Sequence, residues 1–293
     1  MTTPPVGRIP AFVNAKAGTA DKAKEALADA PGFELRMVEP DDLVASIEAA
    51  VSEGADRVLV SGGDGSIATA AGALIGTRTA LALLPGGTLN HFARDHGIPT
   101  EPAEALALAR DGRAQPTDVG FVNDRLFHGT SSLGAYIRYV ALREQLRPRL
   151  GYRLSSAVAV IRVLARLRTY RVTVRVEGVE RTYHTPAIFI GVGERELKPP
   201  TLGGRVADGQ RALHVLVASG GRARQLVFMA LLALARGVWP AARTRWLDAF
   251  LVDECRADPP LHGIALSIDG EVIEMRAPLR YRLQRDALLV VRP

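Results

Sequence analysis

Two short glycine-rich segments of the sequence combine residue types that suit phosphate binding. Residues 62–66 read Gly-Gly-Asp-Gly-Ser between an apolar run and an alanine-rich run, and residues 84–90 read Leu-Pro-Gly-Gly-Thr-Leu-Asn after the next apolar run. Glycine lets backbone N–H groups approach a phosphate, and the start of a following helix adds a favourable dipole. A tight Asp-Gly turn would also explain the first segment if it stood alone. The second segment is therefore needed to favour phosphate binding.

Asp64, within the first segment, indicates a metal ion beside the phosphate. Two negative charges repel each other, so a carboxylate here needs a magnesium ion or its water shell between itself and the phosphate oxygens. The residue types of this segment therefore favour a nucleotide with magnesium.

The elements around these segments alternate between strands and helices. Short apolar runs predict strands, and alanine-rich runs with charged residues predict helices. The expected strands are residues 8–14, 34–38, 57–61 and 80–84, and the expected helices are residues 19–29, 41–52, 67–74 and one that begins near Asn90. This order is typical of an open α/β layer with a mostly parallel sheet, where ligands bind at the carboxyl ends of strands. Both glycine segments follow a strand, so we expect them to form one crevice.

The pattern changes near residue 117 to alternating strands with turn residues, which predicts a β-rich second half. The expected strands there are residues 170–176, 182–190, 212–218 and 264–268. Two arginine-rich, helix-like segments interrupt them, residues 140–168 and 222–250. We therefore expect an α/β domain over residues 1–120 and a β-rich domain over residues 121–293, whose last strand returns to the first domain.

The composition fits a globular protein in a reducing compartment. The chain has 293 residues, 47% of them hydrophobic, enough for a large core and two domains. Cys255 is the only cysteine, so no intrachain disulfide forms, and we expect a cytoplasmic location. The longest apolar stretch, residues 226–235, is far shorter than the ~20 residues of a spanning helix. A formal charge of +6 suits anionic partners.

With two further motifs, the glycine segments resemble the diacylglycerol kinase catalytic family. The further motifs are Asn-Ala-Lys-Ala-Gly at residues 14–18 and Thr-Asp-Val-Gly at residues 117–120, in the same order and spacing. Near the C-terminus, Ile-Asp-Gly-Glu at residues 268–271 resembles a late family motif, and Ala-Asp-Gly at residues 207–209 resembles part of a metal loop. The resemblance runs almost end to end.

This resemblance implies both a fold and an activity. The fold would be an N-terminal Rossmann-like nucleotide-binding domain, related to NAD kinases, followed by a C-terminal β-sandwich, with the active site between them. The activity would be that of an ATP-dependent lipid kinase, which transfers the γ-phosphate of ATP to a free hydroxyl of a lipid such as diacylglycerol. Magnesium would be the cofactor, and contact with the inner membrane face would be peripheral.

The resemblance also assigns binding residues. ATP would be held by Asn14, Ala15, Lys16, Ala17, Gly18, Gly62, Gly63, Asp64, Gly65, Ser66, Ile67, Ala68, Gly87, Thr88 and Asn90. Metal ions and their water would be organised by Asp64 and Asp118 and, in a second structural loop, by Arg205, Asp208 and Gln210. An ordinary Asp-Gly turn would explain that second loop equally well.

Catalysis is assigned to three carboxylates. Asp64 would act beside the phosphates, Asp269 would lie near the transferred phosphoryl group, and Glu271 would be the general base for the acceptor hydroxyl. A hairpin turn with a solvated glutamate is the plain alternative for residues 268–271.

Several positions depart from the family pattern. Ala68 and Thr69 replace the usual Asn and Glu, Val192-Gly193 replaces an Asn-Asn pair, and His91 replaces a frequent aspartate. Ala68, Thr69 and Val192-Gly193 keep open a non-catalytic nucleotide- or lipid-binding module of the same fold. An NAD kinase-like enzyme shares the first glycine segment, and nucleic-acid binding is disfavoured by an aromatic content of only 5%.

The arginine-rich residues 142–171 interleave basic and apolar side chains. Such a segment could rest on anionic lipid, or could pack one side on a core and solvate the other. Neither the lipid acceptor nor the oligomeric state is indicated by the sequence.

Overall fold

The computed structural model describes residues 8–87, 90–196, 205–206, 208–218, 247–260 and 263–293. The chain divides into two compact units. The first unit comprises the residues up to Val119 together with Gln284–Pro293, and the second comprises Gly120–Leu283. Two long strands, β5 (Arg113–Val122) and β16 (Leu279–Arg292), contribute to both units.

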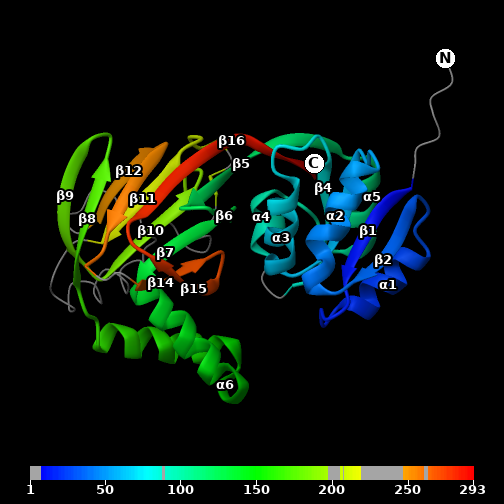
Figure 1. Ribbon diagram of the computed structural model, residues 1–293. Coiled ribbons are helices and arrows are strands. Elements are labelled where there is room, and N and C mark those ends of the chain that lie inside the picture. Colours follow the sequence, from blue (N-terminus) through cyan, green and yellow to red (C-terminus); the bar gives the residue numbers. More distant parts are fainter. Residues whose placement is uncertain (1–7, 88–89, 197–204, 207, 219–246, 261–262) are drawn as a thin grey trace. The chain divides into compact units, whose positions relative to one another are not determined.

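The first unit is a parallel sheet with helices on both faces (Figure 1). Its strand order is β2-β1-β3-β4, with the end of β16 beside β4. The strands are β1 (Ile9–Asn14), β2 (Phe33–Val38), β3 (Arg57–Gly62) and β4 (Ala80–Pro85). The helices are α1 (Ala20–Ala28), η1 (Pro40–Asp42), α2 (Leu43–Ser52), α3 (Asp64–Leu74), α4 (His91–Asp95) and α5 (Pro102–Asp111).

Burial on both faces explains the apolar runs of these strands. Helices α1 and α5 pack with the sheet in one cluster that includes Leu27, Leu59, Leu84 and Leu106. Helices α2 and α3 contact each other and strands β1, β3 and β4. A parallel sheet covered on two sides needs continuous hydrophobic strands, as β3 and β4 show.

The second unit is a sandwich of antiparallel strands. One sheet has the order β12-β11-β10-β7-β14-β15, and the opposing strands run β16-β13-β8-β9, with β5 and β6 beside β16. The strands are β6 (Arg125–Phe127), β7 (Thr130–Gly134), β8 (Tyr170–Val176), β9 (Val179–Thr185), β10 (Ala187–Val192), β11 (Leu213–Ala218), β12 (Leu247–Val252), β13 (Glu254–Asp258), β14 (Gly263–Ile268) and β15 (Glu271–Arg276).

One hydrophobic core joins the two faces of the sandwich. Ile190 and Leu266 from the first sheet and Val174 and Tyr281 from the opposing strands belong to the same buried cluster. Cys255 is buried there too, and this burial raises the pKa of its thiol to about 12. The predicted fold class, an α/β nucleotide-binding-type unit followed by a β-sandwich, is confirmed.

Several predicted elements have different bounds. The strand expected over residues 182–190 is two strands, because Pro186 separates β9 from β10. The helix expected near Asn90 is only α4, five residues long, and α5 follows as a separate helix. Most of the helix expected over residues 222–250 lies outside the described residues, but its last residues are in β12 and therefore in a strand.

The helix expected over residues 140–168 is α6 (Ala135–Ala165), and it bends sharply. Gly151 has a φ of 67° and a ψ of 174° inside it, three residues after Pro148, so α6 consists of two helical arms. No described helix, α6 included, is both long enough and apolar enough to cross a membrane.

Candidate active site

The two glycine segments lie directly against each other in the first unit. The Gly86 N–H donates to the Gly62 carbonyl at 2.9 Å. A Cβ atom on Gly87 would lie 3.0 Å from the Gly63 Cα, and one on Gly86 would lie 2.5 Å from Thr19 Oγ1. Side chains at these positions would push the turns apart, which explains the need for glycine.

Hydrogen bonds extend this arrangement to the end of β1. Asn14 Nδ2 donates to Ser66 Oγ at 2.9 Å, while Asn14 Oδ1 accepts from the Lys16 N–H at 3.0 Å. Thr19 Oγ1 donates to the Gly86 carbonyl at 2.9 Å. The structure therefore brings together the carboxyl ends of β1, β3 and β4, where a doubly covered parallel sheet binds its ligands.

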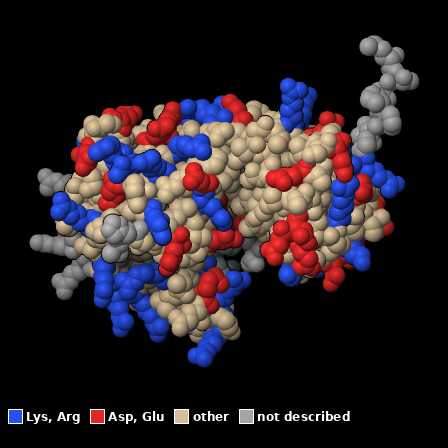
Figure 2. Space-filling view, viewed as in Figure 1, with Lys and Arg blue, Asp and Glu red and all other residues tan. Residues whose placement is uncertain are grey.

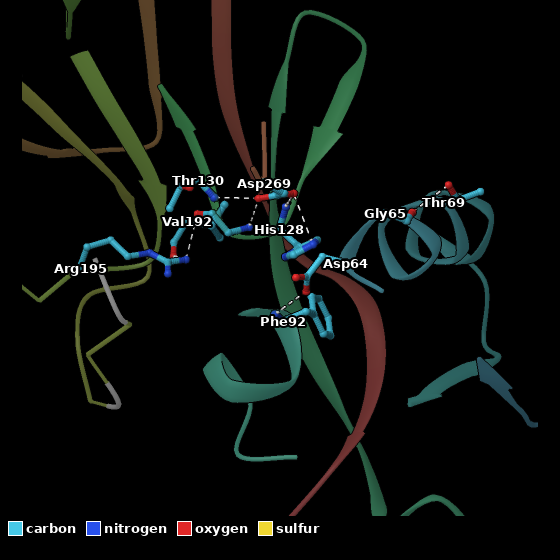
Figure 3. A network of polar contacts seen from close by, with 10 residues as sticks. Asp64, Gly65, Thr69, Phe92, His128, Thr130, Val192, Arg195 and Asp269 are labelled. Carbon is cyan, nitrogen blue, oxygen red and sulfur yellow. Dashed lines mark hydrogen bonds and ion pairs between the residues drawn. The ribbon is translucent and has the colours of Figure 1, made fainter. Parts of the chain in front are cut away.

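Asp64 is the first residue of α3, and its Oδ1 accepts from the Phe92 N–H at 3.3 Å (Figure 3). This bond links the first glycine segment to the start of α4. No described side chain caps α3, so the N–H groups of its first turn are available to an anion. The glycine turns carry no side chains, and they lie beside a helix start whose N–H groups are not capped. This arrangement suits the phosphates of a nucleotide.

Four other residues predicted to bind ATP are Ile67, Ala68, Thr88 and Asn90. Asn90, with a φ of 49°, uses Oδ1 to accept from the Gly87 N–H at 2.8 Å, so its amide shapes the second turn. Ile67 is fully buried in the core and offers only its backbone. Ala68 is half-buried, and Thr88 lies outside the described residues.

Residues 15–18 form the turn after β1. The Ala17 N–H donates to the Asn14 carbonyl at 3.0 Å. Lys16 is exposed and pairs with Glu39 at 2.8 Å, and this hydrogen bond raises the pKa of its ammonium group. Lys16 is therefore charged, and its ammonium group is engaged by Glu39 at the surface.

Two carboxylates predicted to organise magnesium, Asp64 and Asp118, differ in their availability. Magnesium typically binds through one or two carboxylates, with waters and substrate phosphates completing its shell. Asp64, at the start of α3, fits this requirement. Asp118 is 3% exposed, and its Oδ1 accepts from the Asp286 N–H at 3.0 Å, so one of its oxygens is already engaged. Within the described ranges, no group of three or more His, Cys, Asp or Glu side chains could hold a metal unaided.

In the second unit, Asp269 occupies the turn between β14 and β15. Asp269 and Gly270 both have positive φ, as a two-residue hairpin requires. The Asp269 carboxylate accepts three backbone N–H bonds, from His128 at 2.9 Å and from Gly129 and Thr130 at 2.8 Å (Figure 3). Its side chain is only 6% exposed. Asp269 thus fastens the hairpin to the segment between β6 and β7.

Glu271 follows on the same hairpin and is exposed. It makes no hydrogen bond or ion pair within the described part of the chain, and it pairs only through the backbone register with Ile268. The two predicted catalytic carboxylates of this motif therefore differ: that of Asp269 is occupied by backbone donors, whereas that of Glu271 can accept a proton.

Arg195 was missed by the sequence reasoning. Its guanidinium is buried and donates through Nη2 to the carbonyls of Gly129 at 2.9 Å and Val192 at 2.7 Å. The same Gly129 donates its N–H to Asp269, so Arg195 and Asp269 hold opposite sides of one peptide segment. No motif marks Arg195 in a chain with so many arginines, and only the fold reveals the contact.

The predicted second metal loop is closed by a carboxylate that the sequence reasoning also missed. Glu194 Oε2 accepts from the Gln210 N–H at 3.1 Å, and the Glu194 carbonyl accepts from the Val206 N–H at 2.9 Å. Asp208 is exposed, and Arg205 brings a positive charge. The structure describes only residues 205, 206 and 208–210 of this loop, so the second metal site stays a prediction.

His214 is a buried histidine that contacts Arg195, and it gives a prediction about pH dependence. Its Nδ1 accepts from the Arg195 N–H at 3.0 Å, and burial lowers its pKa, assisted by the charge of Arg195 and opposed by that of Glu194. A lowered pKa favours neutral imidazole in the folded state. The resulting stability is present above the ordinary pKa and is lost as pH falls through the folded value.

We therefore expect the free energy of unfolding to fall as the pH is lowered below the ordinary histidine pKa of 6.5, by up to about 1.4 kcal/mol per pH unit from this group. His214→Gln, which keeps an acceptor, should show a flatter dependence in urea titrations at each pH. His184→Gln, at an exposed position of β9, is the matched control. Equal slopes for all three proteins would contradict the assignment.

Comparisons with known proteins agree with this geometry. The family model for the diacylglycerol kinase catalytic domain matches residues 8–122. The chain is 31% identical over 261 residues to "Probable lipid kinase YegS-like" from Pseudomonas aeruginosa (strain UCBPP-PA14), covering 84% of this chain and 80% of that protein. A protein of the same name from Cronobacter sakazakii is 32% identical over 202 residues, which cover 64% of this chain and 65% of the relative, slightly less than two thirds of its length.

A solved structure shows the same fold. A diacylglycerol kinase from Bacillus anthracis str. Sterne superposes with a TM-score of 0.71 over 98% of this chain and 97% of that chain, at 18% identity. Identity this low supports the fold alone, whereas the Pseudomonas relative is similar in sequence over most of both proteins. The chain therefore belongs to the diacylglycerol kinase catalytic-domain family, a family of lipid kinases.

Proposed function

We propose that this protein transfers the γ-phosphate of ATP to a free hydroxyl of a membrane lipid such as diacylglycerol. The observation that carries the proposal is the contact between the two glycine turns beside the uncapped start of α3. Such a cradle of backbone N–H groups is suited to nucleotide phosphates, and the family supplies the lipid acceptor.

The first unit would bind and orient the nucleotide. Backbone N–H groups of residues 62–66 would contact the phosphates, with Asn14 and Ser66 keeping the end of β1 against the turn. Asp64 would hold a magnesium ion, with Asp118 arranging its water. When bound, this ion neutralises the charge that develops on the phosphate oxygens.

The second unit would activate the acceptor. The lipid hydroxyl oxygen forms a bond to the γ-phosphorus while the bond from that phosphorus to the β,γ-bridging oxygen breaks, which leaves ADP. The hydroxyl proton passes to the Glu271 carboxylate as attack proceeds. Asp269 would serve by fixing the hairpin that presents Glu271, because its own oxygens accept backbone N–H bonds.

A non-catalytic nucleotide- or lipid-binding module is the second candidate. It is favoured by Thr69, which stands where the family usually has an acidic residue and whose Oγ1 only donates to the Gly65 carbonyl of its own helix at 3.0 Å. Val192 also replaces a usual family residue, and its backbone carbonyl accepts a hydrogen bond from Arg195. Binding without turnover would follow if these positions carry essential contacts in active relatives.

Transfer of labelled γ-phosphate to lipids in mixed micelles tests the proposal. The acceptors are diacylglycerol, monoacylglycerol, a sphingoid base and phosphatidylglycerol, each with ATP and magnesium. We expect labelled lipid from the wild-type protein with at least one acceptor and none with Asp64→Ala. A wild-type protein that binds ATP in a filter assay but labels no lipid would instead identify the binding module.

A further inference from the structure

Almost all of the excess positive charge of the chain lies in and just after α6. Residues 135–168 contain one glutamate, Glu144, and eight arginines, a net charge of +7, whereas the whole chain nets +6. The eight arginines are Arg138, Arg143, Arg147, Arg149, Arg153, Arg162, Arg166 and Arg168. Figure 2 shows blue side chains gathered over this helix. The rest of the chain is nearly neutral, so this charge is a local feature of one element.

The same helix exposes large apolar side chains. Of the nine exposed large hydrophobic residues in the described part of the chain, five are on α6, and Ile161 is 67% exposed. The other four are Tyr136, Leu150, Leu154 and Val160. A solvated helix face usually carries polar residues instead. Apolar side chains interleaved with arginines are typical of helices that lie at a membrane interface.

The two arms of α6 enclose a groove of about 590 Å³. The first arm contributes Arg138, Ala141, Leu142 and Gln145, a stripe spaced as one face of a helix, and the second contributes Arg162, Val163, Ala165 and Arg166. Arg138 Nη1 donates to the Arg166 carbonyl at 3.4 Å, which ties the start of one arm to the end of the other.

The charge inside this groove is uncompensated. No carboxylate lines it, and Arg138, Arg162 and Arg166 form no ion pair with any part of the chain that the structure describes. By contrast, Glu144 pairs outside the groove with Arg143 and Arg147. The groove is lined by three arginines and by aliphatic side chains. The arginines suit a phosphate head group, and the aliphatic side chains suit the acyl carbons next to it.

We propose that the α6 groove and its exposed apolar face bind anionic phospholipid at a bilayer surface. Nucleic acid would satisfy the arginines but would leave Leu154, Val160 and Ile161 in water, whereas a bilayer buries them. This docking deepens the proposed function, because it would bring the enzyme to its lipid acceptor. It is measured without ATP, so failure of catalysis and failure of docking are distinguishable.

Co-sedimentation with phosphatidylcholine vesicles, with and without phosphatidylglycerol, tests the proposal. We expect binding only with phosphatidylglycerol. The triple variant Arg138→Ala, Arg162→Ala, Arg166→Ala should partition roughly a hundredfold more weakly, from about a fivefold loss per arginine at an anionic surface. The matched control, Arg125→Ala, Arg276→Ala, Arg280→Ala, removes the same charge from exposed positions elsewhere on the second unit and should change partitioning by less than about threefold.

Apolar contact is tested separately with Ile161→Ser against Val272→Ser, an exposed position on β15. Only the first should weaken vesicle binding. The proposal is overturned if both triple variants lose binding equally, if pure phosphatidylcholine binds as well, or if soluble glycerol phosphate binds as tightly as vesicles. Preferential binding of an RNA or DNA oligonucleotide, lost in the groove variant, would assign the surface to nucleic acid instead.

Discussion

Replacing Glu271 by glutamine is expected to lower kcat for lipid phosphorylation by about 10²- to 10⁴-fold, the usual contribution of a general base. Glutamine keeps the size and hydrogen-bonding capacity of the side chain but cannot accept a proton at neutral pH. Because Glu271 is exposed and makes no bond within the described structure, the free energy of unfolding should change by less than about 0.5 kcal/mol.

Glu274→Gln is the matched control for this measurement. Glu274 lies three residues along the same strand, β15, is also exposed, and changes the net charge equally when substituted. Labelled-phosphate transfer should be near the wild-type rate in Glu274→Gln. Near wild-type transfer in Glu271→Gln as well would show that another group accepts the hydroxyl proton.

Asp269→Asn is expected to act mainly on stability, with a loss of roughly 2–4 kcal/mol in the free energy of unfolding. Asparagine can keep one oxygen for the Gly129 and Thr130 N–H groups, but its NH₂ would face the His128 N–H, so two donors would meet at a buried position. Bonds to the remaining oxygen would also lose their charge assistance.

The measurement for Asp269 is urea unfolding followed by circular dichroism, with Asp124→Asn as the control. Asp124 is exposed in the turn between β5 and β6, and its substitution should cost less than about 0.5 kcal/mol. Activity of Asp269→Asn should fall as well, since the hairpin that carries Glu271 would loosen. A variant as stable as wild type but inactive would mean that Asp269 acts on the phosphoryl group directly.

The pairing of these results separates two roles that one short motif combines. Residues 268–271 suggested both a hairpin and a catalytic motif, and the structure has the hairpin with one carboxylate engaged and one exposed. Glu271→Gln is expected to lower kcat without changing the free energy of unfolding, whereas Asp269→Asn is expected mainly to lower the free energy of unfolding. These two results together would identify Asp269 as a positioning residue.

Sequence alone determined the parts of this protein that depend on local pattern. Apolar runs before Gly62 and Gly86 identified β3 and β4, and the position of both turns after parallel strands predicted that they would meet. The fold class and the lipid kinase family followed from the same motifs. A cytoplasmic location and the named acceptor stay predictions.

Only the tertiary structure decided what the buried polar groups bind. Asp269 is engaged by N–H groups about 140 residues earlier in the chain, and Arg195 by a carbonyl 66 residues away. The bend at Gly151 divides one predicted helix into two arms with a groove between them. The backbone conformation of Gly151 is not helical, and helical periodicity in the sequence does not predict it. Propensity and periodicity encode contacts between near neighbours, whereas hydrogen-bond partners across a sandwich are chosen by how the sheets pack.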